Sequence, residues 1–129
     1  MEKVCGIGGI FFKARDPEAM RAWYARHLGL DIQPWGGAAF PWTDAAGQPS
    51  GGSTIWSVSG LDNNYFGPSQ APFMINYRVA DLARLLEQLR AAGCEVLDKS
   101  GEDSEYGKFG WVIDPEGNKV ELWQPPPGQ

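Results

Sequence analysis

The sequence has few cysteines and few basic residues. Its two cysteines, Cys5 and Cys94, each lie in an apolar, strand-like segment, so we expect reduced, buried thiols rather than a disulfide. Eleven Lys and Arg residues stand against sixteen Asp and Glu, a net charge of −5. This balance argues against nucleic acid as a partner, because nucleic-acid binding needs clustered Lys and Arg.

Long apolar runs are also missing. No stretch approaches the roughly 20 apolar residues that a bilayer-spanning helix needs, and residues 1–4 lack the apolar region of a secretory signal. We therefore expect a cytoplasmic protein without membrane contact. The 129 residues, 43% apolar and 21% charged, are typical of one ordinary globular domain with its own core.

Tryptophan and glycine, in contrast, are abundant, with six Trp and seventeen Gly. Trp is large and amphipathic, so an excess beyond one core indicates a ligand pocket or an interface.

The chain repeats itself. The pattern of residues 10–29, an apolar strand, an Asp and a helix-like run ending in Gly, returns about 65 residues later at 75–93. Residues 42–47 are likewise echoed by residues 112–117. Two such half-domains of about 60 residues, placed side by side, can enclose a pocket that neither makes alone.

Local signals define the elements of the first half. Residues 5–14 predict a strand, Asp16 and Pro17 predict the start of a helix, and Gly29 predicts its end. Met20, Trp23, Tyr24, His27 and Leu28 fall on one face of this helix, the face expected to pack on the rest of the domain. Strands are expected at 31–35, 38–43 and 53–59.

The second half follows the same order. A strand at 73–79 leads to a helix capped by Asp81, with an apolar stripe of leucines from 82 to 89, and this helix stops at Gly93. Strands follow at 94–97, 108–113 and 119–124, with a solvated polar loop at 99–106. The turn at 114–118 reads as a hairpin, and Asp44 and Asp114 are turn residues.

We therefore predict a single domain of the α+β class, built from two tandem βαβββ modules. The first module covers residues 5–60 and the second covers 73–124, joined by a linker at 61–72. Residues 125–129, rich in proline, form a flexible tail.

Strand alternation indicates which side chains face the pocket. In the last strand Val120 and Leu122 should pack on the helices, which turns Glu121 and Trp123 to the concave side. The hairpin then sets Trp111 opposite Glu121 and Phe109 opposite Trp123. The full set of predicted ligand-binding residues is Phe11, Trp56, Met74, Asn76, Arg78, Phe109, Trp111, Glu121 and Trp123. A mostly apolar cavity with a few polar groups is the usual form of a small-molecule site.

Three blocks resemble the vicinal oxygen chelate superfamily, which includes glyoxalase I, the bleomycin-resistance proteins and extradiol dioxygenases. They are residues 10–17, residues 23–30 and, above all, the DPEGNKVEL segment at 114–122. This resemblance covers the chain from about residue 5 to 124. It implies the glyoxalase/bleomycin resistance fold, in which the curved mixed sheets of two modules form a cup-like cavity.

The resemblance also implies where a metal would sit. The four ligand positions of the metal-using members fall here on Gly9, Trp56, Met74 and Glu121, of which only Glu121 is a ligand type. One carboxylate cannot hold an ion that wants three or four ligands, so we expect no metal and no cofactor. His27, the only histidine, lies on a helix expected to face away from the pocket. An extradiol dioxygenase needs two histidines beside its carboxylate, so this class is excluded.

The leading hypothesis is a metal-independent homodimer that binds a small apolar or aromatic molecule, similar to the drug-sequestering bleomycin-resistance proteins. The alternative is a glyoxalase, lyase or isomerase type of enzyme, with Glu121 as catalytic base or with an atypical divalent metal site. Glu121 can equally be a relic of the family pattern, and the aromatic surface can be a dimer interface. The sequence leaves open whether the modules pair within a chain or swap across a dimer, and it does not name the ligand.

Overall fold

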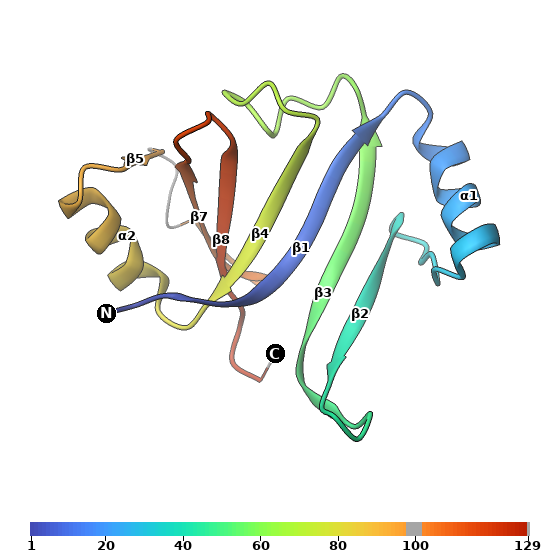
Figure 1. The fold of residues 1–129 in the computed structure, drawn as a ribbon, viewed down its shortest axis with the longest axis horizontal. Helices are drawn as coiled ribbons and strands as arrows, with labels where there is room; N and C mark the ends of the chain where they lie inside the picture. Colours follow the sequence, from blue (N-terminus) through green and yellow to red (C-terminus); the bar gives the residue numbers. More distant parts are fainter. Residues whose placement is uncertain (98–101, 129) are drawn as a thin grey trace.

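The computed structural model describes residues 1–97 and 102–128. It contains two helices and eight strands (Figure 1). In chain order these elements are β1 (Val4–Ala14), α1 (Pro17–Leu28), β2 (Gly37–Thr43), β3 (Pro49–Gly60), β4 (Phe73–Val79), α2 (Leu82–Ala91), β5 (Glu95–Val96), β6 (Glu102–Ser104), β7 (Gly107–Ile113) and β8 (Lys119–Gln124).

All eight strands belong to one curved, open sheet. Its strand order is β2-β3-β1-β4-β8-β7-β5, with β6 paired to β7. The central pair, β1 and β4, is antiparallel and joins the two halves within one chain. In each half the first strand also pairs in parallel with the last, β1 with β3 and β4 with β8. The predicted α+β fold of two repeated modules is confirmed.

The helices begin and end where the sequence indicated. The Asp16 carboxylate accepts a hydrogen bond from the Ala19 N–H at 3.0 Å, and Gly29 ends α1 with a left-handed φ of 71°. The Asp81 carboxylate caps α2 in the same way. Each cap satisfies an N–H group that the first turn of a helix leaves without an intrahelical partner.

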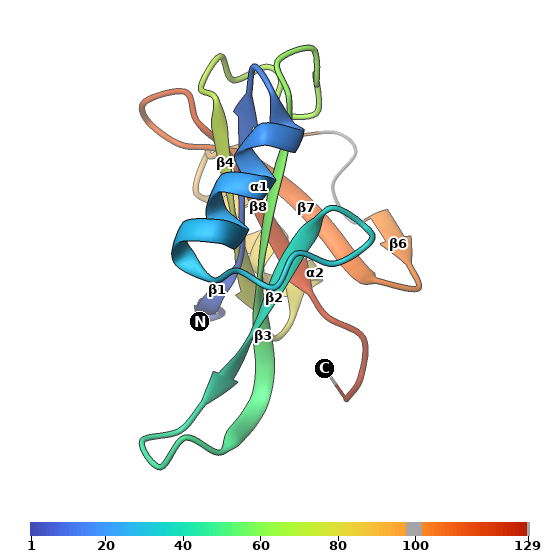
Figure 2. The same ribbon diagram turned by 90° about the vertical axis from the view of Figure 1, so that its right-hand side faces the viewer.

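Both helices pack on the outer face of the sheet, one at each side of the molecule (Figures 1 and 2). Leu82, Leu85 and Leu86 of α2 form a buried cluster with Val79 and Leu122. The cluster beneath α1 contains Ala14, Ala38, Trp56 and Val58, with Met20 and Tyr24 packed against it. The inner, concave face is thereby left to form the cavity.

The stripe predicted for α1 is wrong at three positions, Trp23, His27 and Leu28, which are all exposed. Trp23 is 50% exposed and Leu28 is 60% exposed, whereas Met20 and Tyr24 contact the core. The five predicted positions span a wide arc of the helix. The helix rests on the sheet along a narrower line, so the flanks of that arc meet solvent.

The segment at 31–35 is a turn and not the predicted strand. The Gln33 N–H donates to the Gly37 carbonyl at 2.8 Å, and the Gly36 N–H donates to the Gln33 carbonyl at 2.9 Å. Pro34 has no N–H to offer a neighbouring strand. Two strands rather than three therefore follow α1.

Two further predictions need correction. Cys5 and Cys94 are free thiols, as expected, but both are exposed rather than buried. The segment predicted as a polar loop at 99–106 contains the short strand β6. The part of that loop at 99–101 lies outside the described residues. Neither α1 nor α2 combines the length and the apolar character that crossing a bilayer requires.

The echoed turns are confirmed as equivalent structures. In each, the Asp carboxylate oxygen Oδ1 accepts hydrogen bonds from the backbone N–H groups two and four residues further on, at 2.9 to 3.0 Å. Asp44 does this before β3 and Asp114 before β8. Gly47 and Gly117 take φ values of 80° and 86°, a region that other residues rarely adopt. The repeated sequence therefore marks a repeated turn.

Candidate functional site

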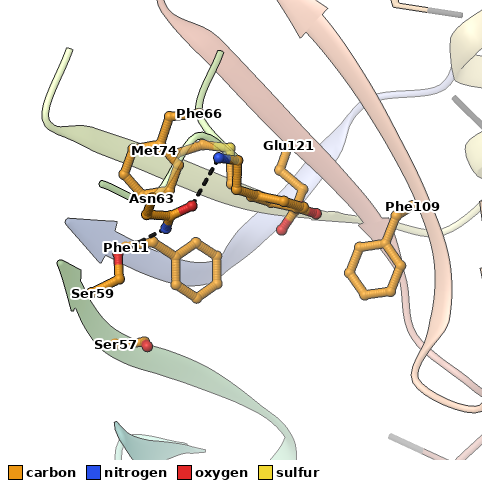
Figure 3. A pocket seen from close by; sticks show the side chains of 9 residues that line it. Phe11, Ser57, Ser59, Asn63, Phe66, Met74, Phe109 and Glu121 are labelled. Carbon is orange, nitrogen blue, oxygen red and sulfur yellow. Dashed lines mark hydrogen bonds between the residues drawn. The ribbon is translucent and has the colours of Figure 1, made fainter. Parts of the chain in front are cut away.

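The concave face of the sheet carries a cavity with two compartments. The first, which we call the serine compartment, has a volume of about 240 Å³ and is lined by Phe11, Ser57, Ser59, Asn63, Tyr65, Phe66, Met74, Phe109 and Glu121 (Figure 3). The second, the indole compartment, has a volume of about 260 Å³ and is lined by Gly8, Phe11, Ser53, Ile55, Asn76, Glu105, Tyr106, Phe109, Glu121 and Trp123. Phe11, Phe109 and Glu121 belong to both and divide them.

Glu121 is the polar centre of this cavity. Strand register sets it opposite Asn76 on β4 and opposite Trp111 on β7, so the three side chains share the concave face. The Asn76 amide Nδ2 donates to Glu121 Oε1 at 2.7 Å, and the Trp111 indole Nε1 donates to Oε2 at 2.9 Å. Glu121 is only 3% exposed. A carboxylate this buried needs such donors to offset the loss of water.

A third donor comes from the linker between the halves. The Tyr65 hydroxyl donates to Glu121 Oε2 at 2.7 Å. Its own backbone is held by the Lys119 ammonium, which donates to the Tyr65 carbonyl at 2.6 Å, and by the Asn63 side chain, which accepts from the Tyr65 N–H at 2.8 Å. Sequence reasoning missed Tyr65, since a loop without periodicity gives no signal for the direction of its side chains.

The three donors leave Glu121 with unused capacity on one oxygen. Oε2 accepts two hydrogen bonds and Oε1 accepts one from the described residues, and each carboxylate oxygen can accept about two. Because a carboxylate only accepts, the NH₂ end of Asn76 must face it, which fixes the amide orientation. Asn76 Oδ1 is consequently turned away, buried and without a hydrogen-bond partner among the described residues.

Gly8 makes room for that amide. A Cβ on Gly8 would overlap Asn76 Oδ1 and would lie only 3.0 Å from Trp123 Cε3. Only glycine lets β1 pass this near to β4 with Asn76 in place. The position was not predicted from the sequence, in which Gly8 is one of three glycines within four residues.

The residues around Glu121 do not fit a divalent metal ion. Among the family's ligand positions, Gly9 offers no side chain, Trp56 points away from the cavity and Met74 offers only a thioether. Residues 1–97 and 102–128 contain no group of three or more His, Cys, Asp or Glu side chains placed to hold an ion. The atoms that touch the Glu121 oxygens are N–H and O–H donors, which have the wrong polarity for coordination.

Six of the nine predicted ligand-binding residues line the cavity; these are Phe11, Met74, Asn76, Phe109, Glu121 and Trp123. Trp111 is buried and touches the carboxylate without lining either compartment. Arg78 lines neither, because its guanidinium lies over the ring of Trp42 at 5.1 Å and that of Trp123 at 5.8 Å.

The placement of Trp56 in the cavity is wrong. Its ring packs on the outer face beneath α1, 5.0 Å from the ring of Tyr24 and 5.5 Å from that of Phe12. The cavity receives the opposite face of β3, with Ile55 and the serines at 53, 57 and 59. The more apolar face of a strand packs on the helix, and Trp56 shares its face with Val58. The rule that the more apolar face of a strand packs on the helix placed the side chains of β8 correctly. Applied to β3, it also gives the face that the structure shows.

The fold is a curved sheet of two modules, and a carboxylate on its last strand faces the cavity. Residues 9–123 match the family model described as a glyoxalase-like domain, and the chain belongs to this family. The resemblance to the glyoxalase/bleomycin resistance group is thereby confirmed. No curated protein sequence matches the chain.

Solved structures of this superfamily are similar to the chain over nearly its whole length. A methylmalonyl-CoA epimerase in complex with methylmalonyl-CoA and NH4+ shares 15% identity, covering 98% of this chain and 99% of that one, with a TM-score of 0.69. The methylmalonyl-CoA epimerase of Mycobacterium tuberculosis shares 16% identity, covering 96% and 90%, with a TM-score of 0.62. A glyoxalase/bleomycin resistance protein/dioxygenase superfamily member of Vibrio splendidus 12B01 shares 15%, covering 96% and 99%, with a TM-score of 0.58. At these identities the likeness establishes the fold.

Proposed function

We propose that this protein binds a small apolar or aromatic molecule in its cavity without a metal ion, similar to the drug-sequestering bleomycin-resistance proteins. The observation that carries the proposal is the state of Glu121. At the position where metal-using relatives carry a ligand, its two oxygens accept three hydrogen bonds from neutral donors. The carboxylate is thus built into the wall of the cavity instead of standing ready to coordinate.

The walls support an apolar or aromatic ligand. Phe11 and Phe109 lie on either side of the carboxylate (Figure 3), and Tyr106 and Trp123 extend the aromatic surface into the indole compartment. Aromatic rings bury much area and stack on flat molecules with preferred geometry. Each compartment holds few polar groups, and such a mixture is usual for small-molecule sites.

Native mass spectrometry combined with metal analysis of protein purified without chelator tests the proposal. A retained organic molecule, with metal far below one ion per chain, is the expected result. Titration of an aromatic panel against tryptophan fluorescence then measures affinity. Phe109→Ala should weaken binding, whereas Phe40→Ala, an exposed phenylalanine on β2, should not. A metal ion near one per chain overturns the proposal.

A second candidate is an enzyme in which Glu121 acts as a base. The acceptor capacity left on Oε1 supports it, because a base must reach the proton that it removes. The fold is also that of the methylmalonyl-CoA epimerases named above, although fold alone does not carry activity. Turnover of a candidate substrate that Glu121→Gln abolishes and Glu87→Gln preserves would favour this function.

We also propose a homodimer. Ile7 and Ile10 on β1 and Phe73 on β4 are each about two-fifths exposed, although the pairing of β1 with β4 sets them at the centre of the sheet. Clustered exposed apolar side chains mark association surfaces. Sedimentation velocity across a concentration series should give a dimer, and a monomer throughout would refute it.

A further inference from the structure

The two compartments differ in charge, although they share Glu121. Two carboxylates, Glu105 and Glu121, line the indole compartment, and among residues 1–97 and 102–128 no Lys or Arg lines it. Glu121 is the sole charged residue among the described residues that line the serine compartment, and two lysines lie against aromatic rings of its wall. Lys13 Nζ lies 5.3 Å from the centre of the Phe66 ring, and Lys119 Nζ lies 4.8 Å from that of Tyr65. A positive charge is therefore better placed in the indole compartment.

Two acceptor groups lie in the wall of the same compartment. Asn76 is 3% exposed and lines it, and its Oδ1 has no hydrogen-bond partner among the described residues. The remaining capacity of Glu121 Oε1 lies next to it, because the same amide bonds to that oxygen. Buried acceptors with unused capacity are costly, so a ligand N–H that reaches the spare position on Glu121 Oε1 gains stability.

From these two observations, and resting on the proposed function, we infer that the ligand is an organic cation. Its flat apolar body lies between Phe11 and Phe109, and its protonated nitrogen enters the indole compartment between Glu105 and Glu121. The nitrogen donates to Glu121 Oε1, and hydrogen bonds between ionised partners are about twice as strong as neutral ones. The aromatic rings of Tyr106 and Trp123 favour a cation through their faces. Arg78 touches the Trp123 ring without lining the compartment, so it does not fill the place of the cation.

A matched pair of probes tests the charge. Isothermal titration calorimetry compares 1-naphthylmethylammonium with 1-naphthylmethanol, which has the same ring system and no charge. We expect the cation to bind about tenfold more tightly, an advantage of the size that a charge-assisted hydrogen bond supplies. Glu121→Gln should remove this preference and Glu105→Gln should reduce it. Glu87→Gln, an exposed carboxylate on α2, should leave it unchanged.

The outcomes separate this inference from the proposed function. A third probe, the anion 1-naphthoate, completes the set. Equal binding of the first two probes, or tighter binding of 1-naphthoate, overturns the inference of a cationic ligand and leaves an aromatic-binding pocket. Binding of none of the three overturns both. If Glu121→Gln fails to fold, Glu105→Gln decides, because Glu105 is exposed and its loss spares the buried network. A preference that persists undiminished in Glu105→Gln, at low and high salt alike, also overturns the inference.

Discussion

Asn76 and Glu121 lie opposite each other on the parallel strands β4 and β8, and a hydrogen bond of 2.7 Å joins Asn76 Nδ2 to Glu121 Oε1. This pair links the strand register directly to the chemistry of the cavity. A slip of β4 by one residue against β8 would turn Asn76 to the outer face. The Glu121 carboxylate would then remain in the cavity without this donor.

Removing the Asn76 amide should therefore destabilise the protein. Asn76→Ala deletes a hydrogen bond to a buried carboxylate, and such bonds are worth about 1.5–3 kcal/mol. Urea unfolding should show a loss of that size in the free energy of unfolding. The control is Asn64→Ala, since Asn64 is exposed in the linker and should change stability little. Equal stability of both variants would contradict the role given to the amide.

A side chain at position 8 should disturb the same amide. Gly8→Ala places a Cβ that overlaps Asn76 Oδ1, and such overpacking costs about 1–3 kcal/mol. The double variant Gly8→Ala/Asn76→Ala removes the atom that clashes. Its loss of stability should be smaller than the sum of the two single losses, because contacting residues are not additive. A double-mutant cycle by chemical denaturation measures this coupling, and simple additivity would argue against the contact.

Alanine substitutions at Trp56 and Phe109 should differ in their main effect, which is on stability for Trp56 and on ligand binding for Phe109. Trp56 belongs to the core beneath α1, so Trp56→Ala should cost about 3–5 kcal/mol of stability and act on ligand binding only through the fold. Phe109 is partly exposed and lines both compartments, so Phe109→Ala should weaken binding more than it weakens the fold. Thermal unfolding and ligand titration on both variants check this split. A stable Trp56→Ala protein with lost binding would place the indole in the site after all.

The Asp114 turn predicts a dependence of stability on pH. Hydrogen bonds from the Asn118 side-chain amide and backbone N–H hold the pKa of Asp114 below its ordinary value of 3.8. Since the pKa is lower in the folded state, this stabilisation is fully present above the ordinary pKa. It is lost as the pH falls through the folded pKa. The Asp114 side chain is partly exposed, so solvent screens the effect.

The midpoint temperature of Asp114→Asn should accordingly lie below that of the wild type near neutral pH, and the gap should close toward pH 2. Asn118→Ala removes the strongest of the donors and should flatten the acid dependence of an otherwise intact turn. Differential scanning calorimetry across this range measures both. A gap that widens in acid would reverse the sign argued here.

Much of the architecture followed from local sequence signals. The caps Asp16 and Asp81 and the hairpin after Asp114 depend on interactions within a few residues, so the sequence alone specifies them. The face of β8 also followed, because Val120 and Leu122 mark the helix side unambiguously. From that face came Glu121, Trp123 and their neighbours on β7.

What the sequence left undecided depends on contacts between distant residues. Trp56 fits a pocket wall or a core by composition; the apolar face that it shares with Val58 indicates the helix side, and the packing of α1 on β3 shows it there. Tyr65 reaches Glu121 across 56 positions from an aperiodic linker, and no local rule directs it. The close approach of Gly8 to Asn76, whose buried Oδ1 has no hydrogen-bond partner among the described residues, exists only once β1 pairs with β4. Interactions between residues close in sequence determined the helices, strands and turns of this protein. The packing of these elements on one another determined which side chains line its cavity.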